Sequence, residues 1–130
     1  TKTTNVYDLT TPYKGSFAGT PSYNGDSVRF NESDNTTGTL FTVNAVDARA
    51  FTFNYTITRD TATRTGVFMV VASTDGSGSN LAYDDSGLEN TNSGVDIAAS
   101  ETGSVITVSY DTTTNTGSDA IISYSITKLA

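Results

Sequence analysis

The sequence predicts an all-β domain, an antiparallel two-sheet sandwich of about seven or eight strands. Three observations favour it: a seven-residue alternating phrase that occurs twice, an abundance of strand formers together with turn formers, and no sustained helical periodicity. The chain has 130 residues, which suits a single domain that buries roughly two-thirds of its unfolded surface.

The repeated phrase spans residues 53–59 and 122–128, and both copies read apolar, polar, Tyr, hydroxyl, Ile, Thr, cation. Alternation with a period of two places one set of side chains on a buried face. The inward residues are expected to be Phe53, Tyr55, Ile57, Ile122, Tyr124 and Ile126. The two segments therefore predict half-buried strands of matching character, which can be neighbours in one sheet.

Residues 1–25 predict an extended N-terminal arm, and residues 26–130 predict the sandwich domain. Pro12, Pro21 and several glycines interrupt the arm and leave room for one short strand near 6–9. Its spaced aromatic residues are the candidate partner-binding side chains: Tyr7, Tyr13, Phe17 and Tyr23. They can cover their own domain or clasp a neighbouring chain, and the sequence leaves both readings open.

The strands expected after the arm are 27–30, 40–43, 50–59, 66–72, 95–99, 105–110 and 120–128. The segment 66–72 is apolar on both faces, so we expect it to be central in its sheet. Residues 73–94 are rich in Gly, Ser, Asn and Asp and predict a long loop, with Leu81 and Tyr83 anchoring its middle. No link contains a crossover helix, which predicts antiparallel pairing throughout.

The charge pattern argues against two classes of partner. The net charge is −7, and the seven basic residues are scattered singly along the chain. Nucleic-acid binding requires a basic stripe, and an anionic membrane surface would repel the chain. The longest apolar run, residues 67–72, is far too short to span a bilayer.

Catalytic chemistry has little support, and we predict that the chain is not an enzyme. It contains no His and no Cys, which excludes Ser-His-Asp and Cys-His arrangements. A carboxylate hydrolase based on Asp84 and Asp85 remains an alternative, with Glu89 and Asp96 nearby. Adjacent residues of an extended segment point in opposite directions, however, so Asp84 and Asp85 would not share a substrate.

One weak metal motif is present and no other cofactor is expected. Asn90, Asn92 and Asp96 place oxygen atoms at nearly alternate positions around a glycine, a donor set that suits Ca²⁺. The same residue types are typical of ordinary turns, so both readings stay open. The inward positions of Tyr55, Tyr110 and Tyr124 favour packing over a sugar-stacking platform.

From Thr39 to the C-terminus, several phrases occur in an order that resembles a known family. They are TLFTV (39–43), FNYTITR (53–59), RTGV (64–67), DDSGLEN (84–90), SGVD (93–96), VITVSY (105–110), TNTG (114–117) and ISYSITK (122–128). The stretch resembles a β-rich domain of tailed-bacteriophage virion proteins, which include capsid decoration or cement proteins and tail-fibre tips. The resemblance implies a jelly-roll-like sandwich, often trimeric and without enzymatic activity, in which the upstream part attaches the domain to the particle.

The function expected from this resemblance is a capsid decoration or cement protein that binds the outer shell as a homotrimer. Its location would be the exterior of the virion, after assembly in the host cytoplasm, and its partners would be its own copies and capsid or tail proteins. A length of 130 residues favours decoration over a long fibre, unless the chain is a fragment of one. The alternative is a tail-fibre or spike tip that binds a receptor or glycan through loops 73–94 and 111–119.

Overall fold

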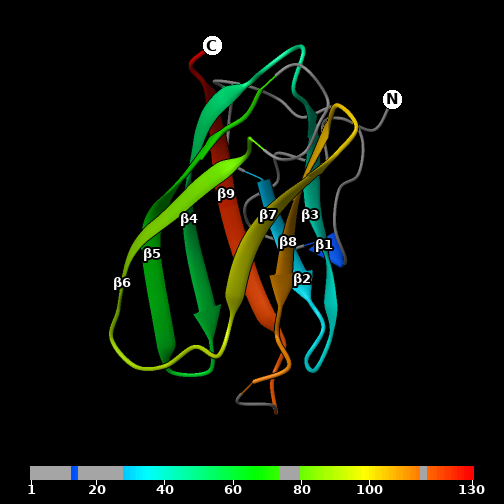
Figure 1. The fold of residues 1–130 in the computed structure, drawn as a ribbon. Helices are drawn as coiled ribbons and strands as arrows, with labels where there is room; N and C mark the ends of the chain where they lie inside the picture. Colours follow the sequence, from blue (N-terminus) through cyan, green and yellow to red (C-terminus); the bar gives the residue numbers. More distant parts are fainter. Residues whose placement is uncertain (1–12, 15–27, 74–79, 115–116) are drawn as a thin grey trace.

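The computed structural model describes residues 13–14, 28–73, 80–114 and 117–130, which contain nine β-strands and no helix (Figure 1). The strands are β1 (Tyr13–Lys14), β2 (Val28–Glu32), β3 (Thr37–Asn44), β4 (Ala50–Arg59), β5 (Ala62–Val71), β6 (Ala82–Glu89), β7 (Asp96–Thr102), β8 (Val105–Asp111) and β9 (Ala120–Lys128). None of the described segments is a helix long and apolar enough to cross a lipid bilayer.

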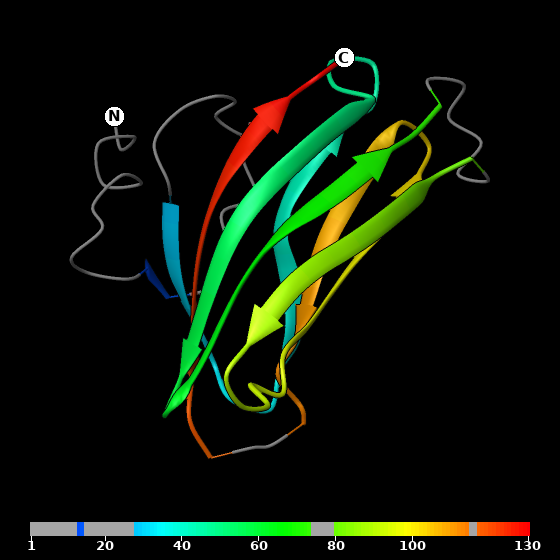
Figure 2. The same cartoon turned by 90° about the vertical axis from the view of Figure 1, so that its left-hand side faces the viewer.

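The strands form two sheets that face each other, as the side view in Figure 2 shows. The larger sheet has the order β1-β2-β9-β4-β5-β6, and the smaller sheet has the order β3-β8-β7. The predicted β-sandwich is thus confirmed. The jelly-roll connectivity remains a prediction. In this chain three consecutive strands, β4, β5 and β6, are neighbours in the same sheet.

Every ladder between the described strands is antiparallel except that between β1 and β2, which pair in parallel through Tyr13–Phe30 and Lys14–Asn31. The expectation of antiparallel pairing throughout is therefore wrong at this edge. The physical reason is length: thirteen residues, 15–27, separate the two strands, and this is enough chain for β2 to run in the same direction as β1. The arm boundary at residue 25 and the strand expected near 6–9 lie outside the described residues.

The repeated phrase forms two adjacent strands, as its pattern allowed. β4 and β9 have the predicted bounds and pair antiparallel, with Tyr55 opposite Tyr124 and Phe53 opposite Ile126. The side chains predicted to face inward are all buried. Period-two alternation identified this face correctly because both strands are covered by the smaller sheet on one side only.

Aromatic rings fill the centre of the sandwich. Phe53 of β4 is fully buried and stacks on Phe68 of β5 with a centroid distance of 4.9 Å. It also meets the ring of Phe41, from the opposite sheet, edge-on at 5.3 Å. Phe41 in turn lies 5.0 Å from the ring of Tyr124. These contacts join both sheets into one core.

The loop predicted for residues 73–94 is wrong over much of its length, because residues 82–89 form the edge strand β6. The sequence there, AYDDSGLE, has few strand formers. An edge strand needs only one ladder partner, and the apolar strand β5 supplies it over eight paired positions. Leu81 packs against the core, and Tyr83 stacks on Phe68 at 5.3 Å, so both anchor this segment as expected. β5 has neighbours on both sides, which confirms that it is not an edge.

Candidate functional site

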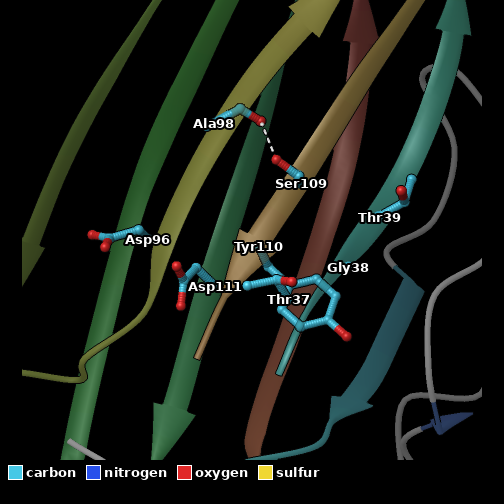
Figure 3. A pocket seen from close by; sticks show the side chains of 8 residues that line it. All are labelled: Thr37, Gly38, Thr39, Asp96, Ala98, Ser109, Tyr110 and Asp111. Carbon is cyan, nitrogen blue, oxygen red and sulfur yellow. Dashed lines mark hydrogen bonds between the residues drawn. The ribbon is translucent and has the colours of Figure 1, made fainter. Parts of the chain in front are cut away.

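The outer face of the smaller sheet holds a polar hollow of about 450 Å³ (Figure 3). Its lining residues come from all three strands: Thr37, Gly38, Thr39, Asp96, Ala98, Ser109, Tyr110 and Asp111. The floor consists of short side chains, and the Ser109 hydroxyl donates to the carbonyl of Ala98 at 3.4 Å. Short residues on three adjacent strands leave space that a ligand group can enter.

Two carboxylates give this hollow its charge. Asp96 and Asp111 are directly opposite each other in the β7–β8 register, an arrangement of like charges that destabilises a sheet. Hydrogen bonds from the hydroxyl and backbone N–H of Thr113 lower the pKa of Asp111. Within the described part of the chain neither carboxylate has an ion-pair partner. The hollow is therefore anionic and suited to sugar hydroxyls or cationic groups.

Tyr110 underlies this hollow and is held in place from within the sandwich. Burial, followed by a hydrogen bond to the buried Glu32, raises the pKa of Tyr110 to about 12. Gly38 is required beside it, since a Cβ at this position would lie 2.8 Å from the Tyr110 hydroxyl. Because Tyr110 is 6% exposed, its ring cannot serve as a stacking platform.

The three candidate calcium residues have different surroundings in the structure. The Asn90 side-chain oxygen accepts hydrogen bonds from the backbone N–H of Thr63 at 2.7 Å and of Thr91 at 2.8 Å. The Asn92 oxygen accepts from the backbone N–H of Gly94 at 2.9 Å, within its own turn. Asp96 instead lines the hollow on the smaller sheet. Among the residues with described positions, no three acidic side chains gather as metal ligands.

Of the candidate partner-binding residues, Tyr13 belongs to β1 at the edge of the larger sheet. Tyr7, Phe17 and Tyr23 lie outside the described residues. The tyrosines predicted to pack inward, Tyr55, Tyr110 and Tyr124, are all buried.

Asp84 and Asp85 point to opposite faces of β6, as expected for adjacent residues. Asp84 is exposed on the outer face, whereas Asp85 accepts hydrogen bonds from the Tyr55 hydroxyl at 2.6 Å and from Arg64 Nη2 at 2.7 Å. Arg64 Nε also donates to the Tyr55 hydroxyl at 2.8 Å. The sequence identified Asp85 but missed its partners, because Tyr55 reaches it across the intervening strand β5.

This Tyr55–Arg64–Asp85 cluster lacks the properties of an activated nucleophile. Burial, followed by the hydrogen bond to Asp85, raises the pKa of Tyr55 to about 12, so its phenol keeps its proton at neutral pH. Arg64 Nη1 lies 3.9 Å from Glu89, which in turn accepts from the Ser93 hydroxyl at 3.0 Å. Each charged group is thus used to hold β6 and the following turn against the sandwich.

Arg59, the cation that ends the first copy of the repeated phrase, closes the base of the sandwich. We define the base as the described residues of the four connections at this end: 33–36, 60–61, 90–95, and 112–114 with 117–119. Arg59 is 3% exposed. Its guanidinium donates to the carboxylate of Asp34 and to the carbonyls of Ser93, Gly94, Thr112, Thr114 and Ser118. One side chain thereby links three of the four connections, and its own position adjoins the fourth.

Comparison with known proteins yields no relative: no family model, no curated protein and no solved structure matches the chain. The functional argument therefore depends on the surfaces and side chains described above.

Proposed function

We propose that the chain is a non-enzymatic structural protein of a bacteriophage particle, a capsid decoration or cement protein that binds the outer shell as a homotrimer. The observation that carries this proposal is the use of the interior polar groups. Arg59, Arg64, Tyr55 and Asp85 hold loops and strands together, which is the role expected of a rigid adhesive module. The phrases between Thr39 and the C-terminus provide the link to virion proteins.

Attachment would involve the N-terminal arm. Its two-residue strand β1 already adds to the edge of the larger sheet beside β2, and strand addition is a common mode of peptide recognition. Apolar contacts from the arm aromatics contribute at most about 1.5–3 kcal/mol each. Repetition over many copies turns such modest contacts into firm attachment.

The test compares the full chain with a variant that lacks residues 1–20. The truncated protein is expected to keep its thermal unfolding transition but to lose binding to purified particles. If the truncated protein decorates particles at normal occupancy, the proposed attachment is wrong. Counting copies of the protein in separated head and tail fractions then distinguishes a decoration protein from a tail component.

A second candidate function, a receptor- or glycan-binding tip, is favoured by the hollow on the smaller sheet. Its hydroxyls and its two carboxylates, Asp96 and Asp111, are groups that hydrogen-bond sugars. A glycan array and a host-cell pull-down with the isolated protein test it. Binding should be lost on Asp96→Asn and kept on Asp84→Asn, a matched change on the other sheet. The absence of binding at high protein concentration would exclude this function.

A further inference from the structure

Over the strands β4, β5, β6 and β9, the outer face of the larger sheet is almost free of charge; Arg29 of the neighbouring strand β2, opposite Ser123, lies beyond this area. Eighteen side chains of β4, β5, β6 and β9 alternate onto this face: Ala50, Thr52, Asn54, Thr56, Thr58, Thr63, Thr65, Val67, Met69, Val71, Ala82, Asp84, Ser86, Leu88, Ile121, Ser123, Ser125 and Thr127. We call this set the neutral face; Asp84 is its one ionised member. The chain as a whole carries a net charge of −7, and depletion of charge is the compositional mark of an interface centre.

An aliphatic strip runs along the neutral face on β5 and β6. Val67, Met69 and Val71 are 38%, 43% and 52% exposed. They alternate with the buried Phe68 and Val70, so the run 67–71 is apolar on both sides of its strand. Such a run is typical of a strand that is covered on both faces. Within a single chain, the described residues cover only one of these faces.

The strip also has a protrusion at one end and a hollow at the other. Leu88, 78% exposed, is the most exposed of the large apolar side chains that the structure describes, and it lies opposite Thr65 in the β5–β6 register. A hollow of about 190 Å³ is lined by Met69, Val71, Ala82, Tyr83 and Asp84. The two features are separated by about five residues of strand, which is roughly 17 Å.

We propose that the neutral face is the contact surface between copies of this chain, with Leu88 of one copy seated in the hollow beside Met69 and Val71 of its neighbour. The inference rests on the oligomer part of the proposed function and assigns that oligomer a surface. A second copy is the occupant that fits the charge pattern. Of the acidic groups that the structure describes, only Asp84 belongs to the neutral face. This is therefore the surface on which two like-charged copies approach with little repulsion.

The arrangement of protrusion and hollow is self-complementary. A two-fold axis between them, near the Val67–Ser86 pair, inserts each Leu88 into the hollow of the other copy. The same contact passed from each copy to the next gives a ring when the rotation between neighbouring copies closes after three of them, as a trimer requires. The molar mass therefore reports which symmetry the contact adopts, and both symmetries depend on Leu88.

The test measures the molar mass of the full chain by light scattering and sedimentation equilibrium over a range of concentrations. Wild type is expected to associate into dimers or trimers. Leu88→Asp should weaken association at least about ten-fold, because it places a carboxylate in a hollow that already contains Asp84. Val105→Asp is the matched control, since Val105 is 44% exposed on a strand of the smaller sheet; it should associate like wild type.

A charge reversal gives the decisive variant. Asp84→Lys combined with Leu88→Asp should restore association, because the new ammonium of one copy faces the new carboxylate of its neighbour. Within one chain these two positions are four residues apart on β6, roughly 13 Å, so an internal ion pair cannot account for the rescue. A monomeric wild type, or association that is insensitive to Leu88→Asp, would overturn the proposal. Particle binding by a monomeric Leu88→Asp variant would leave the attachment role intact and separate the two proposals.

Discussion

The hydroxyl of Tyr55 donates a 2.6 Å hydrogen bond to Asp85 across a space that two facing glycines leave open. Gly66 and Gly87 are opposite each other in the β5–β6 register. A Cβ at Gly87 would lie 2.7 Å from the Tyr55 hydroxyl, and one at Gly66 would lie 2.5 Å from the carbonyl oxygen of Ser86. The missing side chains thus allow a tyrosine of β4 to tie down the edge strand two positions away in the sheet.

This arrangement predicts a specific coupling between Gly87 and Tyr55. Gly87→Ala should lower the free energy of unfolding by about 1–3 kcal/mol, because the added methyl group overlaps the hydroxyl. In a Tyr55→Phe background the cost should fall, since the closest overlapping atom is gone. Urea unfolding of the four proteins in a double-mutant cycle measures the coupling. Equal costs in the two backgrounds would show that the hydroxyl is not what requires the glycine.

Stability should fall at alkaline pH. The pKa of Tyr55 and of Tyr110 is raised to about 12, with burial as the main cause in both, and burial also raises the pKa of Tyr124. In the unfolded chain a tyrosine ionises near pH 10. Above that pH the unfolded state binds fewer protons than the native state, so the free energy of unfolding decreases as pH rises towards the native pKa values.

The measurement is urea unfolding at a series of pH values from about 9 to about 12, with tyrosinate absorbance followed in parallel. Tyr55→Phe provides the control, because removing one of these groups should make the decline less steep. A stability that does not change over this range would contradict the proposed burial of the phenols.

Arg59→Lys should destabilise the protein by about 3 kcal/mol or more. A lysine has a single ammonium in place of the branched guanidinium, so most of the acceptors at the base would lose their donor while remaining buried or partly buried. Arg49→Lys is the matched control, because Arg49 is exposed and the change should cost less than about 0.5 kcal/mol. Thermal and urea unfolding would show the difference, and similar midpoints for the two variants would contradict the role assigned to Arg59.

Phe53→Ala should cost about 3–5 kcal/mol, because it removes a fully buried ring that contacts Phe41 and Phe68 from both sheets. Val67→Ala, on the neutral face, should cost less than about 1 kcal/mol in the monomer. Denaturant unfolding at low protein concentration tests both, since dilution removes any contribution from association.

Several features were predictable because they depend on neighbours along the chain. Alternating side chains placed Tyr55 and Tyr124 in the core, and the matching phrases around them became adjacent strands. The same local logic failed for β6, since its polar residues have little strand preference of their own. β6 forms because β5 provides its backbone hydrogen-bond partners. The loop prediction used only the local sequence, which does not show this pairing.

The candidate sites show the same division. The sequence pointed to Asn90, Asn92 and Asp96 as candidate calcium ligands, but backbone N–H groups engage the side-chain oxygens of Asn90 and Asn92. It contained no signal for the hollow on the smaller sheet, because Asp96 and Asp111 become neighbours only through the register of β7 and β8. Side chains of other strands decide which polar groups remain available for a ligand.

By itself, the sequence determined an all-β sandwich and the buried faces of β4 and β9, since both follow from residue type and local alternation. Only the tertiary structure decided that Arg59 closes the base, that Gly66 and Gly87 make room for the Tyr55 hydroxyl, and that the apolar run of β5 is covered on one side. These depend on which strands pair and in what register. Such contacts join residues far apart in the chain, and no local pattern records them.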